Sequence, residues 1–560
     1  MSRAVREAWL ALLGWTAVAA ALTWPTLRHP ASTIPADLGD PLLQAWQLAW
    51  GGHALLHQPA HPFDSNTFFP LPNSLAFSDS LLGWSPVAAL FGAGPAAALV
   101  RYNVVFVLAC AVCGWGSYLL ARQLGLRRAG AVVAGLVLCA APWRAAQAGH
   151  LQILSCGGVP LALALLARGH GLGAGGRGRP SLDRARPWCA AGGFAVAGWQ
   201  TTMGFGVGLQ AGYLLGLIVV GALVVWVLAG RPPVPRRLAW ADAAGLSAYL
   251  AVAVACALPY LRAAREHPES VRTEAVLGVF SPPAQGFITP PATSWLWGGQ
   301  LTSLRSTLAF PPEMTLGLGG TAVVLAALGA TACGAWSARR RVVLAGALVT
   351  LLIFALGTRG PFGGRLGYLV LFHHAPGFAG IRTPGRLVVT ATVLLALLAA
   401  AGAQAVTDAV GRRHAVLGTA AGLVLAGLVL AEGADDLAHP RPPAAPAAAL
   451  RTGSGPLIVL PSDDAGDEDV MWWSTDGFPR VVNGISGFTP TVTSQIRSDA
   501  LAVLSGGGAA RLRAAGVRRV VVLLGRYGPE VAAAVRGSLP AGVARVEVPA
   551  DDAVVLMLGG

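Results

Sequence analysis

Eleven long segments of this sequence are almost free of charged side chains. An α-helix needs about 20 residues of this kind to cross the hydrocarbon core of a bilayer. Hydrophobic residues make up 54% of the chain and charged residues only 12%, so a mainly α-helical membrane protein is predicted, with one bundle of transmembrane helices. The expected spans are residues 8–27, 101–121, 128–144, 151–168, 188–204, 206–229, 239–261, 315–336, 342–357, 386–406 and 415–433.

The segment of residues 80–100 decides how these spans are oriented. It is apolar enough to cross, but it contains Pro86 and Pro95. If it crosses, the arginine groups at 339–341 and 412–413 face outward. If it lies along the outer surface, these groups join the other arginine-rich connections on the cytoplasmic side. Because basic residues are enriched in cytoplasmic loops, the second arrangement is predicted.

This topology defines the expected domains. Residues 1–435 form the transmembrane domain, with its N-terminus in the cytoplasm, the first run retained as a signal-anchor, and residues 28–100 as an external loop carrying interfacial helices. Residues 436–449 are a proline-rich linker. Residues 450–560 are expected to form a small external α/β domain. The chain is thus predicted to be a multi-pass protein of the bacterial plasma or inner membrane.

Individual stretches support the prediction for the C-terminal domain. GPLIVLP, RRVVVLLG, VARVEVP and AVVLMLG are typical of strands, and RYGPEVAAAVRGSL is typical of a helix. The pair Trp472 and Trp473 in DVMWWSTDGFP has two interpretations. The two rings are either buried in the domain core or exposed as a stacking surface for a glycan.

Other features exclude several functions. The net charge of +14 comes from arginines, since the chain has no lysine, and their place in connections indicates orientation rather than nucleic-acid binding. The seven cysteines lie in or beside apolar segments and give no disulfide framework. CAVC at 110–113 has no second pair to complete a metal site. GLGAGGRGRP at 171–180 follows no predicted strand, so no nucleotide cofactor is expected.

Acidic residues are scarce, yet Asp37 and Asp40 stand directly after the first apolar run. They precede a predicted helix at 41–57, in which Leu and Trp recur at helical spacing with glutamines between them. Asp40 is either an N-cap, with proline following at the first helical position, or a catalytic carboxylate. Asp79 likewise either caps the helix that follows it or supplies a further carboxylate.

Two arginines mark the start of the tenth span. Arg382 and Arg386 flank Pro384 in GIRTPGR, where Thr383 is expected to cap the helix. The positive end of a helix beside two guanidinium groups suits a phosphate or diphosphate. The alternative is that both arginines anchor the helix in lipid headgroups.

A short external turn at 142–152 offers three more polar side chains, Arg144, His150 and Gln152. They are expected either to line a substrate cavity or, for His150, to cap a helix. In FDSNTFFP, Asp64 and Asn66 are expected to form turns. Because ionisable residues are nearly absent within the spans, an ion-coupled transporter is not favoured.

As a whole, the sequence resembles the GT-C superfamily of polytopic glycosyltransferases, which take sugars from polyprenyl-phosphate carriers on the outer face of the membrane. The resemblance covers roughly residues 1–490. The segments that carry it are GDPLLQAWQLAW, NTFFP, SLAFSDSLLGWSP, RYNVVFVLACAVCGWGSYLLARQLG, APWRAAQAGHLQILS, PGFAGIRTPGR and VVNGISGFTP.

The resemblance implies that an acidic residue of the first external loop is the catalytic base, and Asp40 occupies that position. Many GT-C enzymes have a tighter acidic pair than Asp37 and Asp40, so the resemblance leaves open which aspartate serves and whether a divalent metal ion is bridged. The implied partners are a lipid-linked sugar donor, a glycan, lipid or protein acceptor, and membrane lipids. The alternative function is a non-enzymatic protein that binds or translocates a lipid-linked glycan.

Overall fold

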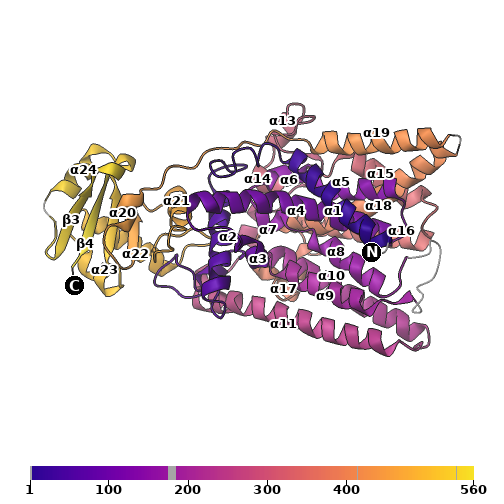
Figure 1. Ribbon diagram of the computed structural model, residues 1–560, viewed down its shortest axis with the longest axis horizontal. Coiled ribbons are helices and arrows are strands. Elements are labelled where there is room, and N and C mark those ends of the chain that lie inside the picture. Colours follow the sequence, from indigo (N-terminus) through magenta and orange to yellow (C-terminus); the bar gives the residue numbers. More distant parts are fainter. Residues whose placement is uncertain (1–2, 174–183, 413, 538, 560) are drawn as a thin grey trace. The chain divides into compact units, whose positions relative to one another are not determined.

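The computed structural model describes residues 3–173, 184–412, 414–537 and 539–559 (Figure 1). This part of the chain forms two compact units. The helical unit consists of Met1–Trp24, Phe106–Cys256 and Arg272–Leu437, and the mixed unit of Pro25–Val105, Ala257–Val271 and Ala438–Gly560. The loop expected at 28–100 therefore groups with the C-terminal region. Most of the glycine-rich stretch at 171–180 lies outside the described residues.

The elements follow one another along the chain as apolar helices and short connecting turns. Two long helices, α4 (Pro95–Gln123) and α11 (Arg236–Glu266), contribute residues to both units. The other helices of the helical unit are α1 (Arg3–Leu22), α5 (Arg128–Cys139), α6 (Trp143–Ala146), α7 (Leu151–Leu154), α8 (Gly158–Gly169), α9 (Pro187–Thr201), α10 (Phe205–Leu228), α12 (Glu274–Val279), α13 (Thr302–Arg305), α14 (Pro311–Met314), α15 (Gly320–Ala332), α16 (Ala338–Ala355), α17 (Tyr368–His374), α18 (Val388–Gly411) and α19 (Ala415–Gly433).

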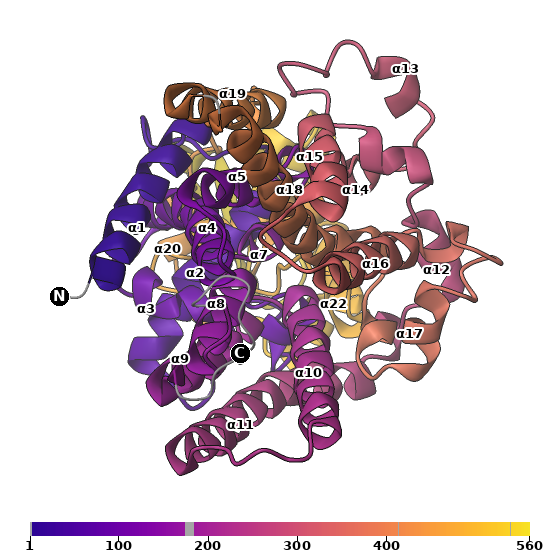
Figure 2. The ribbon, with the colours of Figure 1, turned by 90° about the vertical axis from the view of Figure 1, so that its right-hand side faces the viewer.

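Helix α18 forms the centre of the helical unit, where it packs against α5, α15, α16 and α19 (Figure 2). Glycines make the crossing with α15 very close. A Cβ atom at Gly329 would lie 1.9 Å from the carbonyl oxygen of Leu398, and one at Gly402 would lie 1.9 Å from that of Leu325. Small residues at a helix crossing let two backbones approach, which is how helices associate where no water drives them together.

Eight of the described helices are long and apolar enough to cross a membrane: Val5–Leu22, Pro95–Gln123, Arg128–Ala146, Leu151–Gly169, Phe205–Leu228, Arg236–Glu266, Pro384–Gly411 and Ala415–Gly433. The three other expected spans form α9, α15 and α16, which are shorter or carry more charge. The chain is a multi-pass membrane protein with a small C-terminal sheet, as its sequence predicts.

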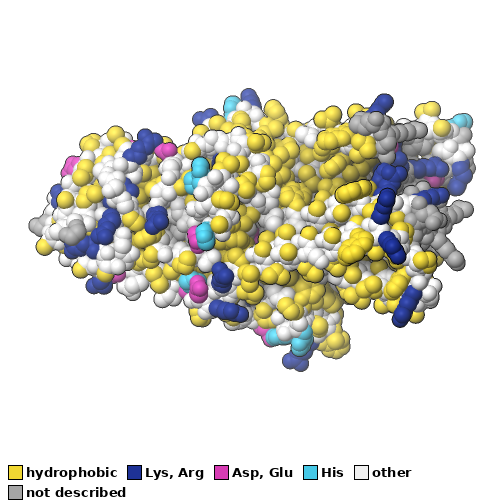
Figure 3. All heavy atoms as spheres, turned by 60° about the horizontal axis from the view of Figure 1, so that its bottom comes forward, with side chains coloured by type: hydrophobic (Ala, Val, Ile, Leu, Met, Phe, Trp, Pro, Cys, Tyr) yellow, Lys and Arg dark blue, Asp and Glu magenta, His cyan; other side chains and the backbone are white. Residues whose placement is uncertain are grey.

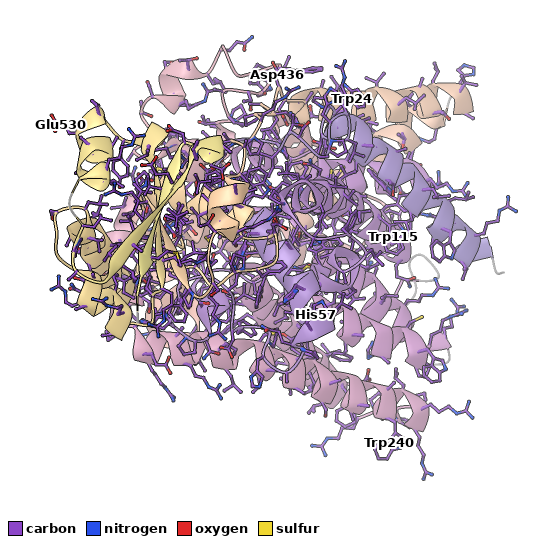
Figure 4. The ribbon with its side chains drawn as sticks, turned by 60° about the vertical axis from the view of Figure 1, so that its left-hand side comes forward. Trp24, His57, Trp115, Trp240, Asp436 and Glu530 are labelled. Atoms are coloured by element: carbon purple, nitrogen blue, oxygen red, sulfur yellow. The ribbon has the colours of Figure 1, made fainter. Side chains whose placement is uncertain are left out.

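The surface of the helices is consistent with contact to lipid. Hydrophobic side chains cover much of the helical surface visible in Figure 3. Large apolar residues of α10 and α11, such as Leu228 and Val254, are exposed. Trp188 and Trp240 lie near the beginnings of α9 and α11 and are 90% and 74% exposed, and Trp240 projects outward in Figure 4. Exposed tryptophans at helix ends are typical of the membrane interface.

The mixed unit contains a four-stranded sheet of order β1-β2-β4-β3, built from β1 (Leu457–Leu460), β2 (Arg519–Leu523), β3 (Val543–Val548) and β4 (Ala553–Leu558). Strands β1 and β2 are parallel, with Leu457 opposite Arg519, and the other pairs are antiparallel. The four predicted strands and the predicted helix α24 (Pro529–Arg536) are confirmed. The other helices of this unit are α2 (Asp40–His57), α3 (Ser85–Ala88), α20 (Ala447–Arg451), α21 (Asp464–Trp473), α22 (Thr491–Val503) and α23 (Ala509–Ala514).

The ambiguous segment at 80–100 does not form a span of its own. A 3₁₀ turn, η2 (Leu82–Trp84), leads into the four-residue helix α3, and Pro95 begins α4. The buried guanidinium of Arg101 explains why the chain turns here. It donates to the carbonyl oxygens of Ala88 at 2.8 Å, Phe91 at 3.3 Å and Gly92 at 2.8 Å, and so satisfies backbone acceptors after α3.

Replacing Arg101 by Leu is expected to destabilise the protein by about 2 to 4 kcal/mol, because three carbonyl acceptors lose a charged donor. The measurement is the thermal unfolding midpoint of the purified protein in detergent. The exposed Arg441 provides a matched control, since Arg441→Leu removes the same charge without removing these contacts. Equal midpoints for both variants would contradict the role given to Arg101.

Candidate active site

Helix α2 begins at Asp40, directly after the acidic loop. Its N-cap is Gly39, and no side chain caps it. The prediction that Asp40 is the N-cap is therefore wrong. Asp37 shapes the loop instead, because its Oδ1 accepts the Gly39 N–H at 2.8 Å. Asp40 thus lies in the first helical turn, where the helix dipole stabilises a negative charge.

The surroundings of α2 differ from the expected amphipathic pattern. Its residues from Pro41 to Gly52 are all buried, including Gln44 and Gln47. The helix therefore has no water-facing polar side over this stretch, and it becomes exposed only towards His57 at its end (Figure 4). A helix that is buried on all sides holds its first turn rigidly, which suits a catalytic group.

Asn66 is the residue that fixes α2, and the expectation that it only forms a turn is incomplete. Its Oδ1 accepts the Trp46 indole N–H at 2.9 Å, and its Nδ2 donates to Ser474 Oγ at 3.0 Å and to the Pro479 carbonyl at 2.9 Å. Asp64 does shape its loop, because its Oδ1 accepts the Asn73 N–H at 2.8 Å. Asn66 thereby links α2 to the C-terminal end of α21.

A third carboxyl group reaches the acidic loop from α21. Both Oε atoms of Glu468 lie within 3.5 Å of the position that a Cβ atom of Gly39 would take, and Asp37 Oδ1 lies 3.2 Å from it. Burial, Asp40 and Asp37 raise the pKa of Glu468 to about 8. The sequence offered one signal, the acidic stretch DDAGDEDV in a chain poor in carboxylates, but its contact with residue 39 is not visible locally.

Asp79 lies half-buried between η1 (Ser74–Phe77) and η2. The helical turn that follows it, η2, has Leu81 as its N-cap, so the expected capping role is not observed. Its role as a further carboxylate of the site stays a prediction.

In the helical unit, the turn η8 (Pro384–Leu387) leads directly into α18. Pro384 is the first helical residue, as predicted, and Thr383 is the N-cap residue but makes no side-chain capping bond. Arg386 grips the carboxylate of Glu313 with two hydrogen bonds, Nη2 to Oε1 at 2.5 Å and Nε to Oε2 at 3.2 Å. The Glu313 side chain is only 4% exposed.

Two residues of the predicted external turn region complete this cluster. Gln147 Nε2 donates to Glu313 Oε2 at 3.2 Å, and His150 Nε2 lies 3.7 Å from Oε1. Burial alone raises the pKa of Glu313, but the charges of Arg386 and His150 and the hydrogen bonds outweigh it, so the pKa lies below its ordinary value. The charge of Arg386 is therefore balanced by Glu313, which no sequence pattern singles out.

Arg382 has a different environment from Arg386. Its guanidinium lies over the ring of Phe280, with Cζ 4.9 Å from the ring centroid. Burial and then the charge of Arg382 lower the pKa of Arg272, so two cations lie within electrostatic reach of each other beside the start of η8. Neighbouring guanidinium groups of this kind favour an anion such as a phosphate.

Arg144 points into the protein, and its predicted role in lining a substrate cavity stays a prediction. It is buried, and its Nη1 approaches Cys113 Sγ at 3.5 Å while Nη2 donates to the Leu154 carbonyl at 3.3 Å. Gln152 is buried in α7. Of these three predicted residues, His150 is the one that the structure brings to Arg386, through Glu313.

The predicted site residues thus fall into two groups. Asp37, Asp40 and Asp79 belong to the mixed unit, and Arg382, Arg386, Arg144, His150 and Gln152 belong to the helical unit. In the described ranges, no three His, Cys, Asp or Glu side chains are arranged to hold a metal ion. Each group is defined within its own unit by the contacts given above.

These features define a class of protein, a multi-pass membrane protein with the GT-C fold. The chain matches the arabinofuranosyltransferase AftD from Mycobacteria over 100% of its own length and 40% of that chain, with a TM-score of 0.50 and 17% identity. It spans less than half of that protein. At 17% identity this match shows a likeness of fold, which agrees with the fold that the resemblance implies.

Two further structures match with lower scores. The oligosaccharyltransferase from Archaeoglobus fulgidus has a TM-score of 0.46 and 14% identity, over 92% of this chain and 69% of that chain. ArnT from Cupriavidus metallidurans has a TM-score of 0.37 and 14% identity, over 99% of both chains. No family model matches the chain, and no curated protein matches it in sequence.

The Glu313 and Arg386 pair gives a prediction for stability. Arg386→Leu is expected to cost about 3 to 5 kcal/mol, because it leaves a buried carboxylate without its main partner. The double variant Arg386→Leu with Glu313→Leu is expected to be more stable than Arg386→Leu alone, since no charge is then left buried. Unfolding midpoints in detergent measure both effects, and a double variant that is no more stable than Arg386→Leu would contradict the pairing.

Proposed function

We propose that this protein is an integral membrane glycosyltransferase that transfers a hexose or pentose from a polyprenyl-phosphate carrier to a glycan, lipid or protein acceptor on the outer face of the membrane. The GT-C fold supports the class of reaction. The observation that carries the proposal is the position of Asp40, a carboxylate in the first turn of a rigidly buried helix whose cap it does not form.

Asp40 acts as the general base in this proposal. It accepts the proton of an acceptor hydroxyl, whose oxygen forms the new bond to the anomeric carbon of the donor sugar. The bond from that carbon to the carrier phosphate breaks, and its electron pair leaves with the phosphate. One direct displacement inverts the configuration at the sugar and needs no covalent enzyme intermediate. General bases of this kind contribute about 10² to 10⁴ in rate.

The phosphate that leaves carries additional negative charge and needs a cation. Arg382 is better suited to this role than Arg386, because the charge of Arg386 is already balanced by Glu313. Arg386 and Glu313 then hold the turn at Pro384 in place, with Arg382 beside the positive end of α18. The acceptor side of the reaction is assigned to the external face, where the arginine distribution of the sequence predicts that Asp40 lies.

Asp40→Asn is expected to lower glycan transfer at least a hundredfold, because the amide cannot accept the proton. The measurement compares glycan and glycolipid profiles of cells lacking the protein with those of the same cells carrying wild-type or variant protein. Glu530→Gln, at an exposed position on α24 (Figure 4), serves as control and restores the profile. If Asp40→Asn also restores it, the protein binds or translocates a lipid-linked glycan without acting as an enzyme.

Substitutions of Arg382 and Arg386 are expected to have different effects in a second experiment. Arg382→Gln lowers the affinity for a polyprenyl phosphate about 10- to 100-fold, since a charged hydrogen bond is lost. The unfolding midpoint of this variant stays close to that of the wild type. Arg386→Gln lowers the midpoint instead. Binding of undecaprenyl phosphate to purified protein in detergent, measured beside thermal unfolding, tests the assignment, and unchanged affinity in Arg382→Gln contradicts it.

A further inference from the structure

Helix α21 carries the C-terminal domain's acidic stretch to the beginning of α2, against which it packs (Figure 1). Several contacts fix its position. Asp463 caps it by accepting the Gly466 N–H at 2.7 Å, and the Trp472 indole donates to the Pro95 carbonyl at 3.0 Å. Trp472 and Trp473 are both buried, which favours the structural interpretation of this pair over a stacking surface.

A buried network on the same helix makes this position rigid. Asp467 accepts hydrogen bonds from Asn483 Nδ2 at 2.6 Å, the Gly484 N–H at 2.9 Å and Ser462 Oγ at 2.9 Å, and it pairs with Arg497. The carboxylate of Asp467 is thus used entirely within the domain. Its neighbour Glu468 projects from a different face of the helix, about 100° around the axis, and its Oε atoms reach the acidic loop.

The acidic loop and Glu468 meet at Gly39. A Cβ atom at this position would lie 3.2 Å from Asp37 Oδ1. It would lie 3.4 Å and 3.5 Å from the two Oε atoms of Glu468, which is ordinary van der Waals contact. Two carboxyl groups from distant parts of the sequence therefore lie beside the backbone that leads into Asp40.

The charges around Glu468 are predominantly negative. Asp40 and Asp37 face it from the loop, and Asp464 and Asp469 act on it from its own helix. Asp469 is paired with Arg526 at 2.5 Å. Tyr102 of α4 lies within electrostatic reach of the same two loop aspartates. A half-buried carboxyl group in such surroundings keeps its proton at neutral pH, which agrees with a pKa of about 8.

We propose that Glu468 is a positioning residue of the transfer reaction, a protonated carboxyl group that the C-terminal domain places beside the Asp37 and Asp40 loop. The proposal rests on the function proposed above. With Glu468 neutral, Asp40 acts as the charged base without a charged carboxylate neighbour from α21, and the anionic carrier phosphate approaches without repulsion from a further carboxylate. The C-terminal domain is then part of the reaction centre.

The proton balance of the reaction is unchanged by Glu468. The acceptor O–H bond breaks and its proton passes to Asp40, which returns it to water after the sugar has moved. Glu468 keeps its own proton throughout. Above about pH 8 it ionises, and the added negative charge beside the base disfavours the phosphate donor.

The test uses N,N′-dicyclohexylcarbodiimide, which modifies protonated carboxyl groups, on membranes that contain the full-length protein. Modification of Glu468 is located by fragment mass spectrometry from pH 6 to pH 9, with Glu468→Gln as the negative control. Modification is expected at pH 7 and is expected to fall about tenfold by pH 9, as for a group that titrates near pH 8. In Asp40→Asn, and independently in Asp37→Asn, the fall is expected at lower pH, because a negative neighbour has been removed.

If Glu468 made only a structural contact, the pH midpoint of its modification would not change with the charge of Asp40. A change of this midpoint is therefore the decisive result. Absence of modification at pH 7, or the same pH midpoint in both aspartate variants as in the wild type, overturns the proposal. The glycan profile distinguishes this outcome from failure of the proposed function. If Asp40→Asn loses the glycan but leaves the midpoint unchanged, only the role of Glu468 is lost; if Asp40→Asn retains the glycan, the enzymatic function itself is lost.

In the same cells, Glu468→Gln is expected to retain the glycan within about twofold, because an amide resembles the protonated acid in shape and hydrogen bonding. Glu468→Lys places a fixed positive charge beside Asp37 and Asp40. This variant is expected to lower the amount of glycan at least tenfold. The amount of each variant in the membrane is measured alongside. Loss of the glycan in Glu468→Gln at normal abundance overturns the neutral role.

Discussion

The hydrogen bonds of Asn66 are the interaction on which the acidic site depends. One amide side chain accepts from Trp46 in the middle of α2 and donates to Ser474 and Pro479 just beyond α21. These bonds are buried, so they are strong and costly to lose. They fix the distance between two helices that begin about 420 residues apart in the chain, and this fixed distance lets Glu468 meet the loop before Asp40.

Buried carboxylates elsewhere in the described residues show how unusual the acidic loop is. Glu313 is held by Arg386, Asp467 by Arg497, and Glu432 by the N–H of Thr321 at the beginning of α15. Each of these negative charges has a donor that balances it, as burial requires. Around Glu468, in contrast, further carboxylates lie close by, and protonation replaces ion pairing. Such an arrangement is typical of a catalytic site rather than of a structural one.

The sequence predicted those features that depend on local pattern. Apolar runs predicted the helices, short runs rich in β-branched residues predicted the four strands, and the Thr-Pro pair predicted where the helix after residue 383 begins. Features that depend on distant partners were missed. Neither Glu313 nor Glu468 carries a local signal of its partner. Arg144 turns inward because α4 offers it the sulfur of Cys113 and α7 the carbonyl oxygen of Leu154. Asp40 is a candidate from the sequence because its position next to an apolar run and a proline is itself a local pattern, and its catalytic role stays a prediction.

The glycine contacts between α15 and α18 limit how the helical unit can move. Where Gly329 and Gly402 meet the backbone of the opposite helix, no side chain cushions the crossing, and sliding one helix along the other would force carbonyl oxygens into Cα atoms. The crossing therefore behaves as a rigid pivot. Freedom to rearrange within the helical unit lies instead in its loosely covered helices. Of their most apolar stretches, only 6% is buried in α10, 11% in α11 and 17% in α19, whereas that of α18 is buried entirely.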